Sequence, residues 1–388
     1  MAPSLRDHWL LNPEIHFLNH GSFGACPRPV LEHQQRLRDQ MERQPVAFMQ
    51  RELPEILDDV RGVLGGFVGA DPADLAFVTN ATSGVNAVLR SLQFEPGDEL
   101  LVTDHAYPAC RNAVEFVARR TGATIKVAHI PLQSTSEEIA DRLIESVGDR
   151  TRLTLIDHVS SATAVVFPVE RIVRELAARD VDALVDGAHA PGMVPVHLEE
   201  LGAAYYTGNC HKWMCAPKGA AFLHVRPDRQ DRVVPPVISH GYDPNATAAS
   251  DFQQMFAWTG TTDPTAAMSI GVAIETIAGY HPGGWPGVMK ANRNLVSAGA
   301  SLVAEALGNP GRTPAAISGS MVSFELPPGY PEKAAWDPLQ DRLLFEYQVE
   351  VPIIPWPHPP RRLLRISAQL YNDFDDYRAL AAALQSVL

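Results

Sequence analysis

The stretch that most constrains the fold covers residues 153–185 and reads LTLIDHVSSATAVVFPVERIVRELAARDVDALV. Its two ends, 153–156 and 183–185, are short apolar runs typical of buried strands. Between them, apolar residues at 169, 172, 173, 176 and 177 follow the spacing of one buried helix face. A strand, a helix and another strand in this order predict parallel pairing, with the helix covering the sheet.

The same alternation continues on both sides, from about residue 75 to residue 230. Thr135, followed three residues later by Glu138, predicts a capping box at the start of another helix. In sheets of this kind ligands bind at the carboxyl ends of the strands, so a site is expected there. Further strands are expected at 76–78, 100–102, 124–127 and 221–223.

The last third of the chain has a different pattern, typical of a smaller α+β domain packed on the first. A proline-rich run at 352–360 is expected to be an ordered loop, because strand character resumes directly after it. The expected elements are helices at 270–280 and 292–307, a strand at 321–326, a helix at 339–347, a strand at 363–366 and a terminal helix.

Composition narrows the choice of partners and compartment. The net charge of −13 opposes binding to nucleic acid. The chain has neither a signal-peptide pattern at its start nor a run of 18 apolar residues, so we expect no membrane contact. Four cysteines suggest no disulfide framework, which favours the cytoplasm. Cys210, His211 and Cys215 lack a second ligand pair, so no metal is expected there.

A candidate phosphate site lies at residues 80–86, NATSGVN. This small polar turn joins a predicted strand to an apolar helix. The start of a helix presents free backbone N–H groups and the positive end of the helix dipole, which together suit a phosphate. Taken alone, Thr82 or Ser83 would more often be just a helix N-cap.

An aspartate ends one of the predicted buried strands. Asp186 follows the apolar run at 183–185, where a buried carboxylate needs a cationic partner. A protonated pyridine nitrogen is such a partner, and a protonated ring stabilises a carbanion at a substrate Cα. The alternative is an aspartate that caps the following turn.

Lys212 follows His211 and lies between two apolar segments. Burial of a lysine lowers the pKa of its amine and makes it nucleophilic toward an aldehyde. The alternative is an ordinary solvated lysine before a strand. Each of these alternatives accounts for one feature alone. None of them accounts for a phosphate turn, a strand-end aspartate and a His-Lys pair that follow one another in this order.

The combination resembles the class V aminotransferase family and, within it, the isopenicillin N epimerase-like group. The similarity runs from FLNHGSFG (17–24) to LRISA (364–368), and its most specific parts are VDGAHAPG (185–192) and HKW (211–213). The resemblance implies a fold-type I, pyridoxal-5′-phosphate-dependent α/β enzyme with a mainly parallel sheet. It also implies a large domain (16–265) and a small C-terminal domain (266–388), joined by the N-terminal segment 1–15.

The same resemblance implies roles for individual residues. Lys212 would hold the cofactor as a Schiff base and move the Cα proton, Asp186 would pair with the pyridine nitrogen, and His189 would approach the phenolic oxygen. The phosphate would be held by Thr82, Ser83, His211 and Asn209.

Other implied residues concern the ring face, the substrate and a second subunit. Tyr107 matches the epimerase-like group as the ring that stacks on the cofactor, whereas His105 matches the related cysteine desulfurases; we favour Tyr107. Thr261 resembles a residue that reaches the phosphate of the neighbouring subunit, which implies a homodimer with shared active sites. Arg365 would bind the substrate α-carboxylate, and Asn19 and His20 would line the same pocket.

The expected activity is epimerisation at the Cα of an amino acid or aminoacyl substrate. C–S β-elimination and transamination stay open, since they use the same scaffold. A persulfide-forming desulfurase is disfavoured, because the last cysteine, Cys215, lies beside the cofactor lysine rather than on a later loop. A nucleotide-binding dehydrogenase is disfavoured by the lack of a G-x-G-x-x-G turn after the first strand. A non-catalytic binding module would not explain the coincidence of lysine, acid and phosphate turn.

Overall fold

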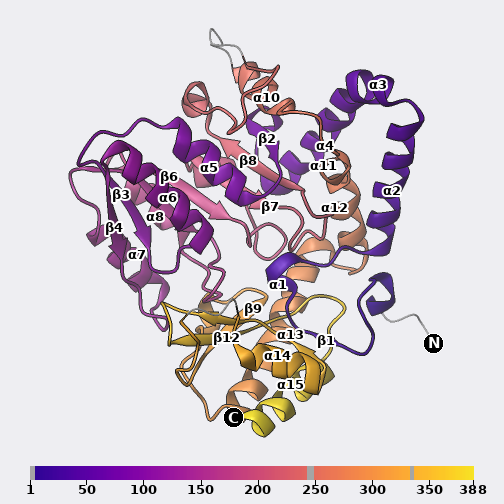
Figure 1. The fold of residues 1–388 in the computed structure, drawn as a ribbon, viewed down its shortest axis with the longest axis vertical. Helices are drawn as coiled ribbons and strands as arrows, with labels where there is room; N and C mark the ends of the chain where they lie inside the picture. The colour runs from indigo at the N-terminus through magenta and orange to yellow at the C-terminus, as the bar shows by residue number, and fades with distance from the viewer. Residues whose placement is uncertain (1–4, 243–248, 333–335) are drawn as a thin grey trace.

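The computed structural model describes residues 5–242, 249–332 and 336–388 (Figure 1). Its centre is a seven-stranded sheet with the strand order β2-β8-β7-β6-β5-β3-β4. The strands are β2 (Leu75–Val78), β3 (Glu99–Thr103), β4 (Thr124–Ala128), β5 (Thr151–Asp157), β6 (Asp182–Gly187), β7 (Tyr205–Asn209) and β8 (Ala221–Val225).

Pairing in this sheet is mainly parallel, as predicted. The neighbours from β4 through to β7 are all parallel, and β8 alone runs against its neighbours β7 and β2. The strand that sequence analysis missed is β7, whose sequence YYTGN contains the weak strand formers Gly208 and Asn209. Its five residues are all buried, so tertiary packing outweighs their local preference.

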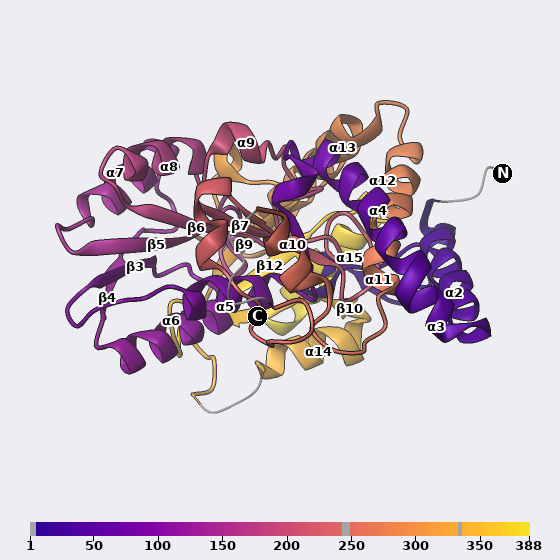
Figure 2. The same cartoon turned by 90° about the horizontal axis from the view of Figure 1, so that it is seen from above.

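Helices cover both faces of the sheet (Figure 2). Alternate strand residues point to opposite faces: Leu184 packs in one apolar cluster, whereas Ala183 and Val185 pack in another. The helices α5 (Ala81–Ser91), α6 (Pro108–Thr121) and α10 (Ala249–Ala257) contribute to the first cluster. The second includes residues of α2 (Arg28–Arg43), α4 (Leu53–Val68), α7 (Ser136–Glu145), α8 (Val169–Ala177), α9 (Leu198–Leu201), α11 (Thr265–Met268) and α12 (Ile270–Gly279).

A smaller antiparallel sheet lies toward the C-terminus, with the strand order β11-β12-β9. Its strands are β9 (Met321–Leu326), β11 (Ile353–Pro355) and β12 (Arg362–Ser367), and the helices are α13 (Gly284–Ala306), α14 (Pro338–Tyr347) and α15 (Phe374–Val387). Near the start of the chain, β1 (His16–Phe17) pairs in parallel with β10 (Val349–Glu350) and leads into the short helix α1 (His20–Phe23).

Most of the predicted elements are confirmed. The Thr135–Glu138 capping box starts α7, with both reciprocal hydrogen bonds present. Helix α13 begins at Gly284 rather than at 292, because Trp285 and Val288 are already buried in its first turns and a proline is tolerated there. The proline-rich run is not all loop, since β11 forms within it as an edge strand. Among the described residues, none of the helices has the length and apolar character needed to cross a bilayer.

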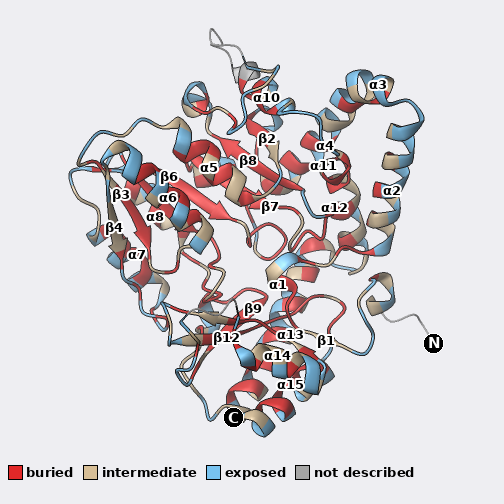
Figure 3. Cartoon of the chain, viewed as in Figure 1, coloured by how far each residue is buried: buried red, intermediate tan, exposed pale blue. Residues whose placement is uncertain are grey.

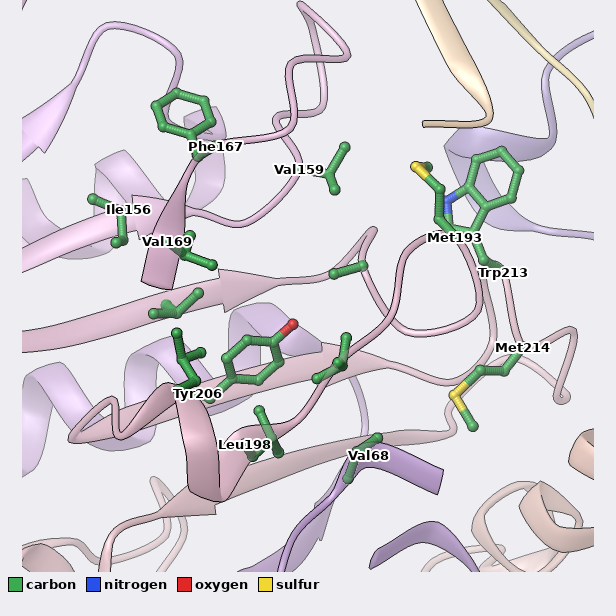
Figure 4. Packing of buried hydrophobic residues seen from close by; sticks show 14 of the residues in the cluster. Val68, Ile156, Val159, Phe167, Val169, Met193, Leu198, Tyr206, Trp213 and Met214 are labelled. Atoms are coloured by element: carbon green, nitrogen blue, oxygen red, sulfur yellow. The ribbon is translucent and has the colours of Figure 1, made fainter. Parts of the chain in front are cut away.

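The buried residues gather along the two sheets, and the exposed ones on the outer faces of the helices (Figure 3). Figure 4 shows part of the larger cluster, including Tyr206, Trp213 and Met214. The apolar face of α12 belongs to this cluster, and α13 spans it and the C-terminal cluster. The domain division after residue 265 stays a prediction, and residues 1–4 of the expected joining segment lie outside the described residues.

Candidate active site

A cavity of about 270 Å³ opens at the carboxyl ends of β5, β6 and β7, where the topology predicts a ligand site. The loops that follow these strands, the start of α5 and the N-terminal α1 form its walls. The lining residues are Ser22, Phe23, Asn80, Ala81, Thr82, Tyr107, Asp157, Val159, Ser161, Asp186, Ala188, His189, Asn209, His211 and Lys212.

Lys212 lies in the wall of this cavity with its amine 3.0 Å from Nε2 of His189. The indole N–H of Trp213 donates to Nδ1 of His189 over 3.3 Å, which leaves the imidazole proton on Nε2. Nε2–H can therefore donate only to a neutral amine. Burial lowers the pKa of Lys212 to about 8, with the charge of Asp186 opposing the shift. Burial, followed by the charge of Lys212, holds the pKa of His189 well below its ordinary value. The lysine is thus prepared as a nucleophile.

Asp186 lies at the end of β6 and faces the same cavity. Its Oδ1 accepts a hydrogen bond of 2.9 Å from the backbone N–H of Ala188, and its Oδ2 one of 3.1 Å from the thiol of Cys110. The carboxylate is 4% exposed, and no protein cation forms an ion pair with it among the described residues. A cationic ligand group fits this position.

The start of α5 forms the polar end of the cavity. Asn80 is the N-cap and accepts from the backbone N–H of Ser83, so the cap is neither Thr82 nor Ser83. Thr82 lines the cavity together with Asn209, whose side-chain oxygen accepts from the N–H of Ala81 over 2.8 Å. Ser83 instead contacts Thr79 and Asn80 and lines a different cavity.

His211 completes this polar end. Its Nδ1–H donates to the carbonyl of Ala220 over 2.9 Å, and Nε2 stays available to the cavity. Burial lowers the pKa of His211 to about 4. A bound phosphate dianion would favour the imidazolium, whose Nε2–H could then donate to it.

Arg365 is buried on β12, next to the cavity. Its guanidinium donates to the carbonyl of Ser161 over 2.7 Å and to the hydroxyl of Ser22 over 3.0 Å, and both serines line the cavity. Burial lowers the pKa of Arg365 to about 10, so it stays charged at neutral pH. None of the ion pairs among the described residues includes Arg365, so no protein acid among them neutralises its charge.

The two N-terminal candidates differ in their positions. The side-chain oxygen of Asn19 accepts from Ser22 and, over 3.4 Å, from Arg365, so it lies behind the guanidinium. The buried ring of His20 donates from Nε2 to the backbone carbonyl of Lys212 and accepts at Nδ1 from Tyr371. His20 is therefore placed beneath the Lys212 backbone and is absent from the cavity lining.

Tyr107 and His105 also differ in their positions relative to the cavity. Tyr107 lines the cavity. His105 is buried away from it, donating from Nε2 to the carbonyl of Ile130 and accepting at Nδ1 from Thr163. Thr261 is exposed and is not part of the cavity lining of its own chain.

Sequence reasoning missed Asp157, Cys110, Ser22 and Ser161. Asp157 could have been found, because it follows the predicted strand 153–156 just as Asp186 follows its strand, and the two are paired in register. Cys110 lies on a covering helix, Ser22 on the short helix α1, and Ser161 in the loop after β5. No local pattern marks these three as facing the site.

Comparisons with known proteins agree with this geometry. The family model described as aminotransferase class-V matches residues 25–298. The chain belongs to the aminotransferase class-V family. It is 35% identical to an isopenicillin N epimerase of Amycolatopsis lactamdurans, covering 98% of this chain and 97% of that protein. A probable chloroplastic L-cysteine desulfhydrase of Arabidopsis thaliana is 31% identical, covering 97% of this chain and 84% of that protein.

A solved structure shows the same fold. A variant of C-DES, with glycine covalently linked to its pyridoxal-phosphate cofactor, superposes with a TM-score of 0.83 at 21% identity over 99% of both chains. The predicted family and fold class are therefore confirmed. The residues of the cavity fit pyridoxal phosphate as well: a helix start and polar donors at one end, a buried carboxylate without a cationic partner among the described residues, and a lysine with a lowered pKa.

Proposed function

We propose that this enzyme acts at the Cα of an amino acid or aminoacyl substrate and, like the isopenicillin N epimerases it is similar to, inverts that centre. The observation that carries the proposal is Arg365. Its buried charge is surrounded by the neutral acceptors of Ser161, Ser22 and Asn19 at the edge of the cavity. A planar guanidinium in this setting suits a substrate carboxylate, which it can bind through two parallel hydrogen bonds.

The other residues would share the work around the cofactor. Lys212 would hold the cofactor and carry the Cα proton, and Asp186 would keep the ring nitrogen protonated. Thr82, His211 and Asn209 would hold the phosphate at the start of α5. Bound in this way, pyridoxal phosphate supplies the electron sink that stabilises negative charge at the Cα.

Inversion needs a second proton donor opposite Lys212, and Tyr107 is the candidate. It lines the cavity, and burial raises the pKa of its phenol, so the phenol keeps its proton. The same ring could stack on the cofactor. Tyr107→Phe preserves the ring and removes the proton, so it should stop inversion while leaving exchange of the Cα hydrogen with solvent deuterium.

C–S β-elimination is the second candidate, supported by the cysteine desulfhydrases among the relatives. It requires no cysteine nucleophile, and all four cysteines of this chain are buried. Burial also raises the thiol pKa of Cys26 to about 12 and that of Cys215 further. A panel of amino acids assayed for inverted Cα, sulfide and keto acid separates epimerisation, elimination and transamination.

Lys212→Ala tests the whole proposal, with Lys218→Ala as the matched control six residues away. Lys218 donates to the carbonyl of Gly24 and lines a different cavity. Borohydride reduction and peptide mapping should place the cofactor on Lys212, and only Lys212→Ala should lose it. Label on Lys218 would contradict the assignment.

We further propose a cytoplasmic homodimer with shared active sites. The exposed position of Thr261 in its own chain supports this, as does Phe23, an apolar side chain that is 75% exposed at the cavity wall. Four free thiols suit a reducing compartment. Mixing inactive Lys212→Ala chains with chains impaired at Thr261 should restore activity. A fully active monomer in sedimentation would rule out the shared site.

A further inference from the structure

Two buried acids face the cavity from neighbouring strands. Asp157 ends β5 and Asp186 lies beside it on β6, paired in register, and each is 4% exposed. Two carboxyl groups so placed are costly to ionise together, so one of them holds a proton. A site that needs a charged carboxylate at Asp186 must therefore distinguish it from Asp157.

Cys110 supplies that distinction. It lies in the first turn of α6, and its thiol is 3.1 Å from Oδ2 of Asp186. The N–H of Ala188 occupies Oδ1. Both oxygens of Asp186 thus accept hydrogen bonds from neutral donors, and such bonds favour the ionised form of a carboxyl group.

The electrostatics agree with this geometry. Burial, and then the charge of Asp186, raises the pKa of Asp157 well above its ordinary value; backbone N–H groups and Lys212 oppose the shift. Burial and the same charge raise the pKa of the Cys110 thiol, which therefore keeps the hydrogen it donates. The other titratable groups that face Asp186 are Tyr107, Tyr206 and Lys212.

We propose that Cys110 is a positioning residue that, by donating its thiol hydrogen to Oδ2, makes Asp186 rather than Asp157 the ionised acid of the pocket. Cys110 itself would touch neither the cofactor nor the substrate and would act through Asp186. This inference rests on the proposed function, because the ionised Asp186 matters through the cofactor ring.

The first test compares Cys110→Ala with Cys110→Ser in the full-length holoenzyme. Loss of the donor should raise the dissociation constant of pyridoxal phosphate by about tenfold, the scale of one hydrogen bond to a charged group. The midpoint of the pH-dependent absorbance change of the bound cofactor should move upward, because a less positive ring lets the cofactor–Lys212 linkage keep its proton to higher pH. Cys110→Ser keeps a donor and should restore both quantities most of the way.

A second substitution separates charge selection from packing. Asp157→Asn replaces the neutral acid with a neutral amide of similar shape. Combined with Cys110→Ala, it removes the competing carboxyl group, so cofactor affinity and the pH midpoint should return toward the wild-type values. If Cys110→Ala acted only by leaving a cavity, Asp157→Asn would not restore these values. A double variant with the affinity and midpoint of Cys110→Ala would overturn the proposal.

Cys26→Ala is the control, since Cys26 is also a buried cysteine but lines a different cavity. It should leave affinity and midpoint unchanged. If wild-type protein fails to bind pyridoxal phosphate, the proposed function itself is wrong. If the wild type binds it and Cys110→Ala matches the wild type in both readouts, only the role of Cys110 is refuted.

Discussion

The two sides of the pocket are built differently. On the acid side, Asp157, Asp186 and Cys110 come from one sheet and from a helix that covers it. On the arginine side, Arg365 contacts Asn19, which lies 346 positions earlier in the chain. The acid side is fixed by strand register and by the sheet itself. The arginine side exists only when the N-terminal segment, the loop after β5 and β12 meet. We therefore expect the acid side to control the chemistry of the cofactor, and the arginine side to control binding of the substrate without disturbing the cofactor.

The largest expected effect comes from the acid side. Asp186→Asn should leave the cofactor bound but slow Cα proton exchange by roughly a hundredfold, because the amide cannot keep the ring nitrogen protonated. Deuterium incorporation from solvent, measured by NMR, reports this rate. A near-normal rate would show that another group provides the electron sink.

A smaller effect, confined to binding, should follow from changing the arginine side. Arg365→Ala should weaken amino-acid binding by at least about tenfold, because truncating a buried charge leaves the carboxylate unpaired. Arg365→Lys keeps the charge but loses the planar pair of donors, so its affinity for the amino acid should lie between those of the wild type and Arg365→Ala. Titration with the amino acid, followed by the absorbance of the cofactor, measures the affinity. Unchanged affinity in a folded Arg365→Ala protein would remove Arg365 from the substrate site.

The smallest effect is on the pH dependence of cofactor attachment to Lys212, which both sides of the pocket influence. Burial lowers the pKa of Lys212 to about 8. The neutral amine should grow from about a tenth to about a half of the population between pH 7 and pH 8, so cofactor attachment to the apoprotein should accelerate about fivefold. Asp186 raises this pKa and Arg365 lowers it. The midpoint should therefore move to lower pH in Asp186→Asn and to higher pH in Arg365→Ala. Stopped-flow absorbance measures the rate, and shifts in the same direction would contradict the comparison.

The division between the two sides also explains which parts of the fold and of the site could be predicted from the sequence. Strand periodicity and the strand-end position of Asp186 are local signals, and they sufficed to predict the mainly parallel sheet and the place of Asp186 at its carboxyl edge. Asp157 carries the same signal at the end of β5 and was available to the same reasoning. The family motifs then supplied Lys212, His189 and Arg365, each of which lies in or beside the cavity.

Long-range contacts could not be predicted in the same way. His20 was expected in the substrate pocket, yet its ring lies beneath Lys212, where Tyr371, 351 positions away in the chain, donates a hydrogen bond to its Nδ1. Ser83 was expected to hold phosphate, yet the cap by Asn80 draws it toward Thr79. Cys110 has no sequence signal at all. Its role depends on how α6 lies against β6, which residue patterns along a single element do not encode.

The contacts of the N-terminal segment bear on when the active site forms during protein synthesis. β1 pairs with β10, His16 contacts Asp376 over 2.8 Å, and His20 contacts Tyr371. These N-terminal residues therefore obtain their partners only when nearly the last residues of the chain have left the ribosome. The central sheet, with its acids and Lys212, is complete in sequence long before that and can fold first. The nascent chain would carry the cofactor lysine well before the arginine side can close, so the substrate pocket is expected to be completed only after release.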